Sequence, residues 1–101
     1  MPAVIAPATA AQARRLKALG HPVRLGIALR LAAEPETCAC DFADVFGVRQ
    51  PTVSEHLRVL REAGLVRTRR QGTQICYSLA DDAVADLEEL ARLLRGSAAM
   101  R

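Results

Sequence analysis

The chain has 101 residues and a formal net charge of +3 at pH 7. This length gives one small domain with a limited core, so association with a second copy would stabilise it. Only 3% of the residues are aromatic and tryptophan is absent, which requires an aliphatic core. No apolar run reaches the roughly 20 residues of a membrane span, and the first residues lack the basic and apolar regions of a signal peptide.

Charge and cysteine content restrict the class of protein further. Residues 49–70 hold six arginines and two glutamates, whereas residues 81–95 hold five acidic residues and two arginines. The basic segment favours contact with phosphates, and an arginine-rich solvated surface is the alternative. Three cysteines, without an export signal, favour reduced thiols and a cytoplasmic location over a disulfide framework.

Two helices are expected in the N-terminal third of the chain. Residues 1–8 carry two prolines and are expected to be mobile. A first helix over about 9–19 ends at Gly20, and its small apolar residues suit a close helix contact. A second helix over about 22–33 begins with a proline, and we expect His21 before it to be a local cap or packing residue rather than a ligand.

The next segment predicts a helix–turn–helix. Thr37 suits the N-cap of a helix that ends at Gly47, and Pro51 opens a second helix that ends at Gly64. The second helix would bury three residues at helical spacing, namely Val53, Leu57 and Leu60. Its other face would enter the major groove of DNA, and an ordinary helical hairpin with a solvated face is the alternative. That exposed face, with the residue before it, comprises Arg49, Gln50, Thr52, Ser54, Glu55, His56 and Arg58.

A β-hairpin follows the helix–turn–helix. Residues 65–68 and 73–79 are rich in β-forming residues, and the turn between them carries Arg69, Arg70 and Gln71. A hairpin directly after a reading helix predicts a winged helix whose tip contacts phosphates through these side chains. A plain surface hairpin is the alternative.

A last helix over about 81–95 has apolar residues at heptad spacing. One small domain cannot easily cover so wide an apolar stripe, which predicts a dimer seam shared with the first helix. Docking only on its own core is the alternative. The expected seam comprises Leu16, Val84, Leu87, Leu90, Ala91 and Leu94.

The expected fold is therefore mainly helical, with four helices, a small β-hairpin and a fifth helix. Residues 9–95 would form one winged helix–turn–helix domain for DNA binding and dimerisation, and residues 96–101 a C-terminal tail. The expected partners are double-stranded DNA and a second copy of the chain, with no membrane.

Cys38 and Cys40 are candidate sensing thiols at the start of the first helix of the helix–turn–helix. Paired thiolates select soft ions, and a helix N-terminus favours the thiolate form. Residues two apart on a regular helix point away from each other, so both could hold one ion only if the first turn opens. Such opening would misplace the reading helix. Two inert core cysteines are the alternative, and Cys76 is either a third ligand or a small buried hydrophobic residue.

The segments LKALGHPVRLGIALRL, TCACDF, VRQPTVSEHLRVLREAGLV and RRQGTQICYSL resemble successive signatures of the ArsR/SmtB metal-sensing repressors. The resemblance covers about residues 12–79. It implies a homodimeric winged helix that binds operator DNA and dissociates when a metal or metalloid binds. It also implies that four residues of the second helix face the operator, namely Gln50, Thr52, Ser54 and His56.

The cysteine segment resembles that of the family's arsenic sensors, except that Ala43 stands where those carry a third cysteine. No histidine follows His56, so the last-helix site of the family's zinc sensors is absent, and the N-terminus lacks the added cysteines of cadmium or lead sensors. The resemblance thus points to As(III) or Sb(III) as inducer, with another soft ion such as Cd, Pb or Hg left open.

Three functions remain open from the sequence. The leading one is a repressor released by a soft metalloid, and the second is a repressor of the same fold released by oxidation of its thiols. The third is a winged-helix module that binds protein instead of DNA. An enzyme is not expected, because the chain has no nucleophile–base pair at a known spacing and no glycine-rich phosphate loop.

Overall fold

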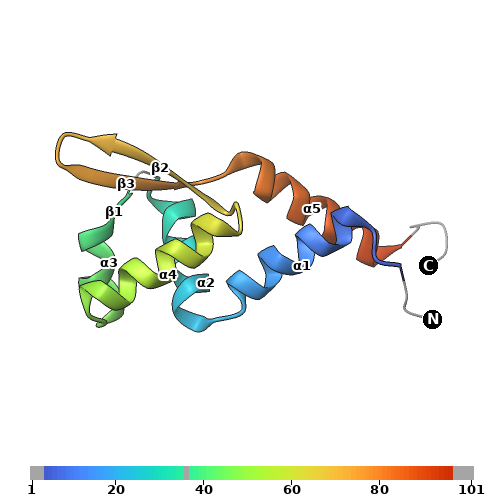
Figure 1. Cartoon of the computed structure of the whole chain (residues 1–101), viewed down its shortest axis with the longest axis horizontal. Helices are drawn as coiled ribbons and strands as arrows, with labels where there is room; N and C mark the ends of the chain where they lie inside the picture. The colour runs from blue at the N-terminus through green and yellow to red at the C-terminus, as the bar shows by residue number, and fades with distance from the viewer. Residues whose placement is uncertain (1–3, 36, 97–101) are drawn as a thin grey trace.

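A computed structural model of the chain describes residues 4–35 and 37–96, without the side chains of residues 39–41. The expected tail from residue 97 and the first three residues lie outside it. Figure 1 shows the predicted winged helix–turn–helix, with a third short strand before the helix–turn–helix. The elements are α1 (Pro7–Leu19), α2 (Pro22–Ala33), β1 (Thr37–Cys38), α3 (Ala39–Phe46), α4 (Gln50–Glu62), β2 (Val66–Gln71), β3 (Gln74–Leu79) and α5 (Asp81–Arg95).

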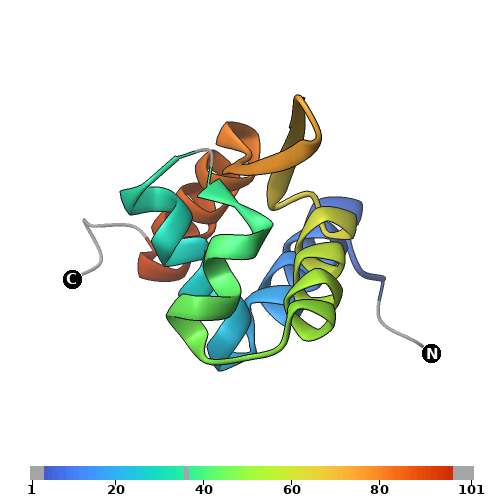
Figure 2. The ribbon, with the colours of Figure 1, turned by 90° about the vertical axis from the view of Figure 1, so that its left-hand side faces the viewer.

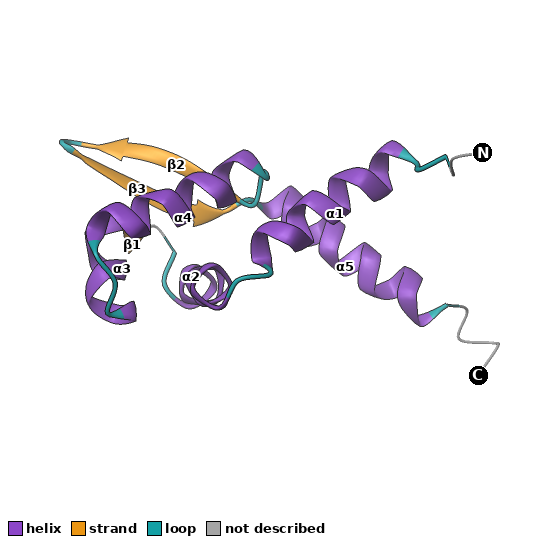
Figure 3. Ribbon diagram, turned by 60° about the horizontal axis from the view of Figure 1, so that its bottom comes forward, coloured by secondary structure: helices purple, strands orange, loops and turns teal. Residues whose placement is uncertain are grey.

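The molecule is elongated, with extents of 50 × 33 × 25 Å. The helix–turn–helix of α3 and α4 and the tip of the β2–β3 hairpin lie at one end, and α1 and α5 lie toward the other (Figures 1 and 3). An end-on view shows α3 and α4 side by side in front of α2 (Figure 2). The reading helix therefore begins at the end of the fold opposite α5, and its C-terminal part contacts α1.

The core is aliphatic, as the composition requires. The predicted buried face of α4 is confirmed, since Val53, Leu57 and Leu60 are each at most 1% exposed. They pack with Ile27 of α2 and Phe42 of α3, which are fully buried. This shared core fixes α4 by one face and leaves its opposite face to solvent.

The helix ends follow the local sequence signals closely. The second helix has the expected bounds, and His21 is its N-cap, with Nδ1 accepting the Val23 N–H at 3.1 Å. Gly47 adopts the left-handed conformation that ends α3, at φ 64°. The first helix begins at Pro7, before the expected start at Thr9, because proline is well suited to a first helical turn. The N-terminal leader is correspondingly shorter than residues 1–8.

The expected N-cap of the third helix is wrong. Thr37 lies in strand β1, and its Oγ1 donates a hydrogen bond of 2.6 Å to the Glu34 carbonyl. Cys38 is the residue that caps α3, without a side-chain cap bond. The backbone of this pair is held in an extended conformation by β3, because Thr37 lies opposite Tyr77 and Cys38 opposite Cys76. Cys38 therefore belongs to a sheet and not to a helix.

The hairpin turn is tighter than expected. Strand β2 continues to Gln71, which lies opposite Gln74, so the turn contains only Gly72 and Thr73. Gly72 has a φ of 65°, as a two-residue hairpin turn requires. The sheet order is β1-β3-β2, with all pairs antiparallel. Arg69 and Arg70 consequently lie on a strand rather than in a turn.

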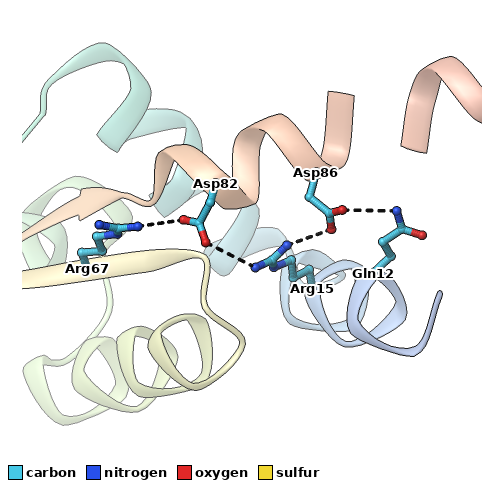
Figure 4. A network of polar contacts seen from close by, with 5 residues as sticks. All are labelled: Gln12, Arg15, Arg67, Asp82 and Asp86. Atoms are coloured by element: carbon cyan, nitrogen blue, oxygen red, sulfur yellow. Dashed lines mark hydrogen bonds and ion pairs between the residues drawn. The ribbon is translucent and has the colours of Figure 1, made fainter. Parts of the chain in front are cut away.

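A polar network holds the two terminal helices together (Figure 4). Arg15 of α1 contacts Asp86 of α5 at 2.8 Å and Asp82 at 4.0 Å. Gln12 donates a bond of 3.4 Å to Asp86, and Arg67 of β2 contacts Asp82 at 2.9 Å. The network thus joins α1, α5 and the base of the hairpin.

Among the described residues, no helix is long and apolar enough to cross a membrane.

Candidate nucleic-acid interface and thiol pair

The solvent face of α4 carries short polar side chains. Gln50, Thr52 and Ser54 are exposed, as is Arg49 at the N-cap of the helix. The N-terminal half of α4 points toward the end of the molecule that carries the hairpin tip (Figure 1). A helix that offers hydrogen-bonding side chains beside a projecting hairpin can enter the major groove while the hairpin follows the phosphates.

His56 departs from the expected exposure. Its ring is half-buried, with its Nδ1 3.3 Å from Nη1 of Arg24 and its centroid 4.5 Å from that of His21. Burial lowers the pKa of His56 below its usual value, and the charges of His21 and Arg24 lower it further. Sequence spacing missed these contacts, because it places His56 off the buried stripe without showing that the start of α2 covers that side of α4.

Arg58 is exposed as expected, but it is paired along its own helix. It contacts Glu62 at 2.7 Å through Nη1, and it binds Glu55 through Nε at 3.0 Å and through Nη2. The hydrogen bond from Arg58 lowers the pKa of Glu55, and the two glutamates raise that of Arg58. A phosphate contact by Arg58 would therefore replace exposed ion pairs, which are individually weak.

The two wing arginines lie on opposite faces of β2. Arg69 is opposite Cys76 and Arg70 is opposite Ile75, and side chains alternate along a strand. Arg70 shares its face with Val66, which is buried in the core that also holds α4. Gln71 at the end of the strand accepts a bond of 3.4 Å from the Cys76 thiol. Adjacent sequence positions therefore give the two cations different surroundings.

Cys38 and Cys76 form a thiol pair across β1 and β3. Their Sγ atoms are 3.1 Å apart, well beyond the about 2.05 Å of a disulfide bond. Cys76 is 3% exposed and Cys38 is half-buried. Cys38 also donates to the side-chain oxygen of Gln74 at 3.1 Å. The side chain of Cys40 lies outside the described residues, so the structure brings together Cys38 and Cys76 of the three predicted ligands.

The pair offers two soft donors to one ion. Thiolates prefer soft ions, whereas the neighbouring glutamine oxygens do not. Two sulfurs bound to one tetrahedral ion at about 2.3 Å would lie about 3.8 Å apart, farther than the 3.1 Å between these thiols. No group of three or more His, Cys, Asp or Glu side chains suited to a metal occurs within the described part of the chain. The described soft donors are therefore the two sulfurs of Cys38 and Cys76.

Taken with the fold, an exposed polar helix beside a wing defines a winged-helix DNA-binding regulator. The family model "Bacterial regulatory protein, arsR family" matches residues 21–68. The arsenical resistance operon repressor of Bacillus subtilis is 37% identical over 84 residues, which span 81% of this chain and 80% of that protein. The chain belongs to this family of transcriptional regulators, as its motifs predicted, and it is not an enzyme.

Two further similarities agree with this assignment. The biofilm growth-associated repressor of Agrobacterium fabrum is 49% identical over 74 residues, which span 73% of this chain but only 62% of that protein. A solution structure from Mycobacterium bovis is described as a homodimeric winged helix-turn-helix DNA-binding domain of a possible ArsR-family regulator. It is 33% identical, has a TM-score of 0.70, and the match covers 94% of this chain and 90% of that one.

Proposed function

We propose that this chain is a homodimeric repressor that leaves its operator when As(III) or Sb(III) binds Cys38 and Cys76, with Cys40 as the third thiol. The 3.1 Å separation of the Cys38 and Cys76 sulfurs carries the proposal. The name of the Bacillus subtilis relative supports an arsenical inducer. The Agrobacterium fabrum relative is named for biofilm growth, so family membership alone leaves the inducer open.

The proposed DNA contacts come from α4 and the wing. The reading helix contributes side chains to the bases and the wing contributes cations to the phosphates. Two of the proposed residues already have partners within the chain. His56 is half-buried against α2, and Arg58 is paired with Glu55 and Glu62. The proposed set comprises Arg49, Gln50, Thr52, Ser54, His56, Arg58, Arg69, Arg70 and Gln71.

The thiol pair joins the two DNA-contacting parts of the fold. Cys38 is the N-cap of α3, which packs against α4, and Cys76 lies in β3 of the wing. An ion held by both sulfurs fixes the spacing of β1 and β3 and thereby the angle between the helix–turn–helix and the wing. DNA needs both parts in one relative position, so release requires that the ion hold them in a different one, with differential affinity for the two states.

Dimerisation is proposed through α1 and α5. Leu16 is 48% exposed, Val84 is 39% exposed and Leu94 is 77% exposed. Leu87 packs against the core of its own chain, so it connects the proposed dimer seam to that core. The seam also includes Leu90 and Ala91. Two reading helices related by a two-fold axis would then contact successive major grooves.

The test uses a duplex selected from a random library by the reduced protein. Fluorescence anisotropy would follow release of that duplex during titration with arsenite, antimonite, cadmium, lead, mercury and zinc ions. Release by arsenite or antimonite in the wild type, and its loss in both Cys38→Ser and Cys76→Ser, is the expected result. Cys40→Ser tests the third ligand separately, and a weaker response is expected because one of three sulfurs is lost.

Other outcomes distinguish the alternatives. Release by cadmium, lead or mercury alone would keep the thiol site and replace the inducer. An unchanged arsenite response in Cys76→Ser would refute the cross-strand site. Binding to the selected duplex that is independent of salt would contradict a phosphate-contacting repressor.

A second candidate function is release by thiol oxidation, which the same 3.1 Å contact favours. Hydrogen peroxide would take two electrons and two protons from the Cys38 and Cys76 thiols; one S–S bond forms, the O–O bond breaks, and two water molecules leave. Residues opposite each other on antiparallel strands can meet the Cα spacing of a disulfide. Release by peroxide with a mass loss of two hydrogens, reversed by dithiothreitol, would identify this trigger, whereas arsenite acts without a change in oxidation state.

A further inference from the structure

Arg24 links the start of α2 to the reading helix and to α1. Its Nε donates a hydrogen bond of 2.6 Å to the carbonyl of Ala18 near the end of α1. Its Nη1 lies 3.3 Å from Nδ1 of His56 on α4. The second histidine, His21, lies beside His56 with a ring separation of 4.5 Å. The three side chains lie outside the thiol pair and the α1–α5 network.

The hydrogen bonds define the protonation state of both histidines. An arginine can only donate, so Nδ1 of His56 must accept from Arg24. A backbone N–H can only donate, so Nδ1 of His21 must accept from Val23. Both imidazoles are therefore neutral, with their hydrogen on Nε2. The next proton added to either ring must go to the nitrogen that already accepts a bond.

Few neighbouring groups can compensate for added positive charge. Among the described residues, the charged or titratable groups that act on His56 are His21 and Arg24 from the α2 side and Glu55 from α4 itself. Glu55 is already bonded to Arg58. Arg14 and Lys17 of α1 line the same hollow as Arg24, and so does Glu62 of α4, whose carboxylate is already bonded to Arg58. Protonation would thus place a charge against Arg24 while breaking its bond to His56.

We propose that Arg24, His21 and His56 form a proton-sensitive clasp that positions the reading helix for its operator. At neutral pH the clasp joins α4 to α2 and, through Arg24, to the end of α1. In acid the imidazolium of His56 and the guanidinium of Arg24 repel one another, and α4 loses this contact. Arg24 is here a positioning residue, because its contacts are with His56 and Ala18.

The two kinds of DNA binding respond differently to this change. Binding to any duplex depends on positive charge near phosphates, and protonation adds charge. Sequence-specific binding also depends on the placement of α4 in the major groove. Acidification should therefore lower the ratio of specific to non-specific affinity even where non-specific affinity rises.

The first experiment is an NMR titration of the whole reduced chain, without metalloid, from pH 8 to pH 5. The chain contains only two histidines, so the His21→Asn variant assigns both sets of ring nitrogens. Both rings are expected as the Nε2–H tautomer at pH 7.5. In Arg24→Gln, the titration midpoint of His56 should rise, because a neighbouring cation is lost. The Nδ1–H tautomer for His56, or an unchanged midpoint in a folded Arg24→Gln chain, would overturn the proposal.

The second experiment compares the library-selected duplex with a scrambled duplex from pH 7.5 to pH 5.5. The affinity ratio should fall in the wild type, because protonation adds charge that favours any duplex while α4 loses its placement for the selected one. His21→Asn keeps an N-cap acceptor for Val23 but cannot be charged. It should preserve the ratio at pH 7.5, and the fall should begin at a higher pH than in the wild type, because removal of the His21 charge raises the pKa of His56. A constant wild-type ratio, or a fall at the same pH in both proteins, would contradict the clasp.

Discussion

Arg15 of α1 and Asp86 of α5 are joined by an ion pair of 2.8 Å between side chains that are 18% and 28% exposed. The pair connects residues 71 positions apart and lies within the network that reaches the base of β2 (Figure 4). It is the most enclosed ion pair found among the described residues. Its role is therefore to set how the two terminal helices lie against each other.

We predict that Asp86→Ala lowers the free energy of unfolding by roughly 1–3 kcal/mol, because it leaves the enclosed guanidinium of Arg15 without its closest partner. The matched control is Glu89→Ala, since Glu89 pairs with Arg92 on the exposed side of the same helix. That control should unfold as the wild type does. Urea denaturation followed by circular dichroism measures both, and equal losses would assign no special role to the enclosed pair.

The two wing arginines should contribute unequally to DNA binding. Arg70→Ala should weaken binding to all duplexes and reduce the slope of log affinity against log salt by about 0.9, the value for one phosphate contact. Arg69→Ala should change the slope less, because Arg69 lies opposite Cys76 on the other face of β2. Anisotropy titrations over a range of salt concentrations test this, and identical slopes in the two variants would contradict it.

Sequence reading should depend on the exposed side of α4. Gln50→Ala and Ser54→Ala should each reduce affinity for the selected duplex by about 10–100-fold, the loss that accompanies one base contact. Binding to a scrambled duplex should hardly change. Glu88→Ala on α5 is a control at an exposed site of another helix. Equal losses on both duplexes would show that these residues contact phosphates and do not read bases.

Fold stability should decline in mild acid. The pKa of His56 in the folded chain lies below its usual value, owing to burial first and then to His21 and Arg24. The unfolded chain therefore binds more protons, so the contribution of His56 is complete above about pH 6.5 and is lost as the pH falls through its folded value. The melting temperature should drop from pH 7.5 to pH 5.5, and His56→Gln should reduce that drop. A wild-type melting temperature that does not change with pH would contradict the burial of His56.

Long periodic segments were the predictable part of this fold. The spacing of Val53, Leu57 and Leu60 gave the buried side of α4, and Pro22 with His21 gave the start of α2, because these signals are local. The strand β1 has only two residues, Thr37 and Cys38, which is too short for any period. Its conformation depends on pairing with β3, almost 40 residues away, and helix-capping chemistry at Thr37 pointed to the wrong structure.

The contact between Cys38 and Cys76 was not predictable from sequence spacing. Two cysteines two positions apart suggested a pair within one helix, whereas strand register brings Cys38 to Cys76. No local feature of the sequence indicates how β1 pairs with β3. The same applies to His56, whose contacts with Arg24 depend on how α2 crosses α4.

In the proposed mechanism, one soft ion joins sulfurs from β1 and β3. Arsenic-edge X-ray absorption of the arsenite-loaded, reduced chain tests this directly by counting the sulfur ligands. We predict that Cys38→Ser and Cys76→Ser each have one sulfur fewer than the wild type. An unchanged sulfur count in Cys76→Ser, or a wild type that retains no arsenic, would contradict the claim.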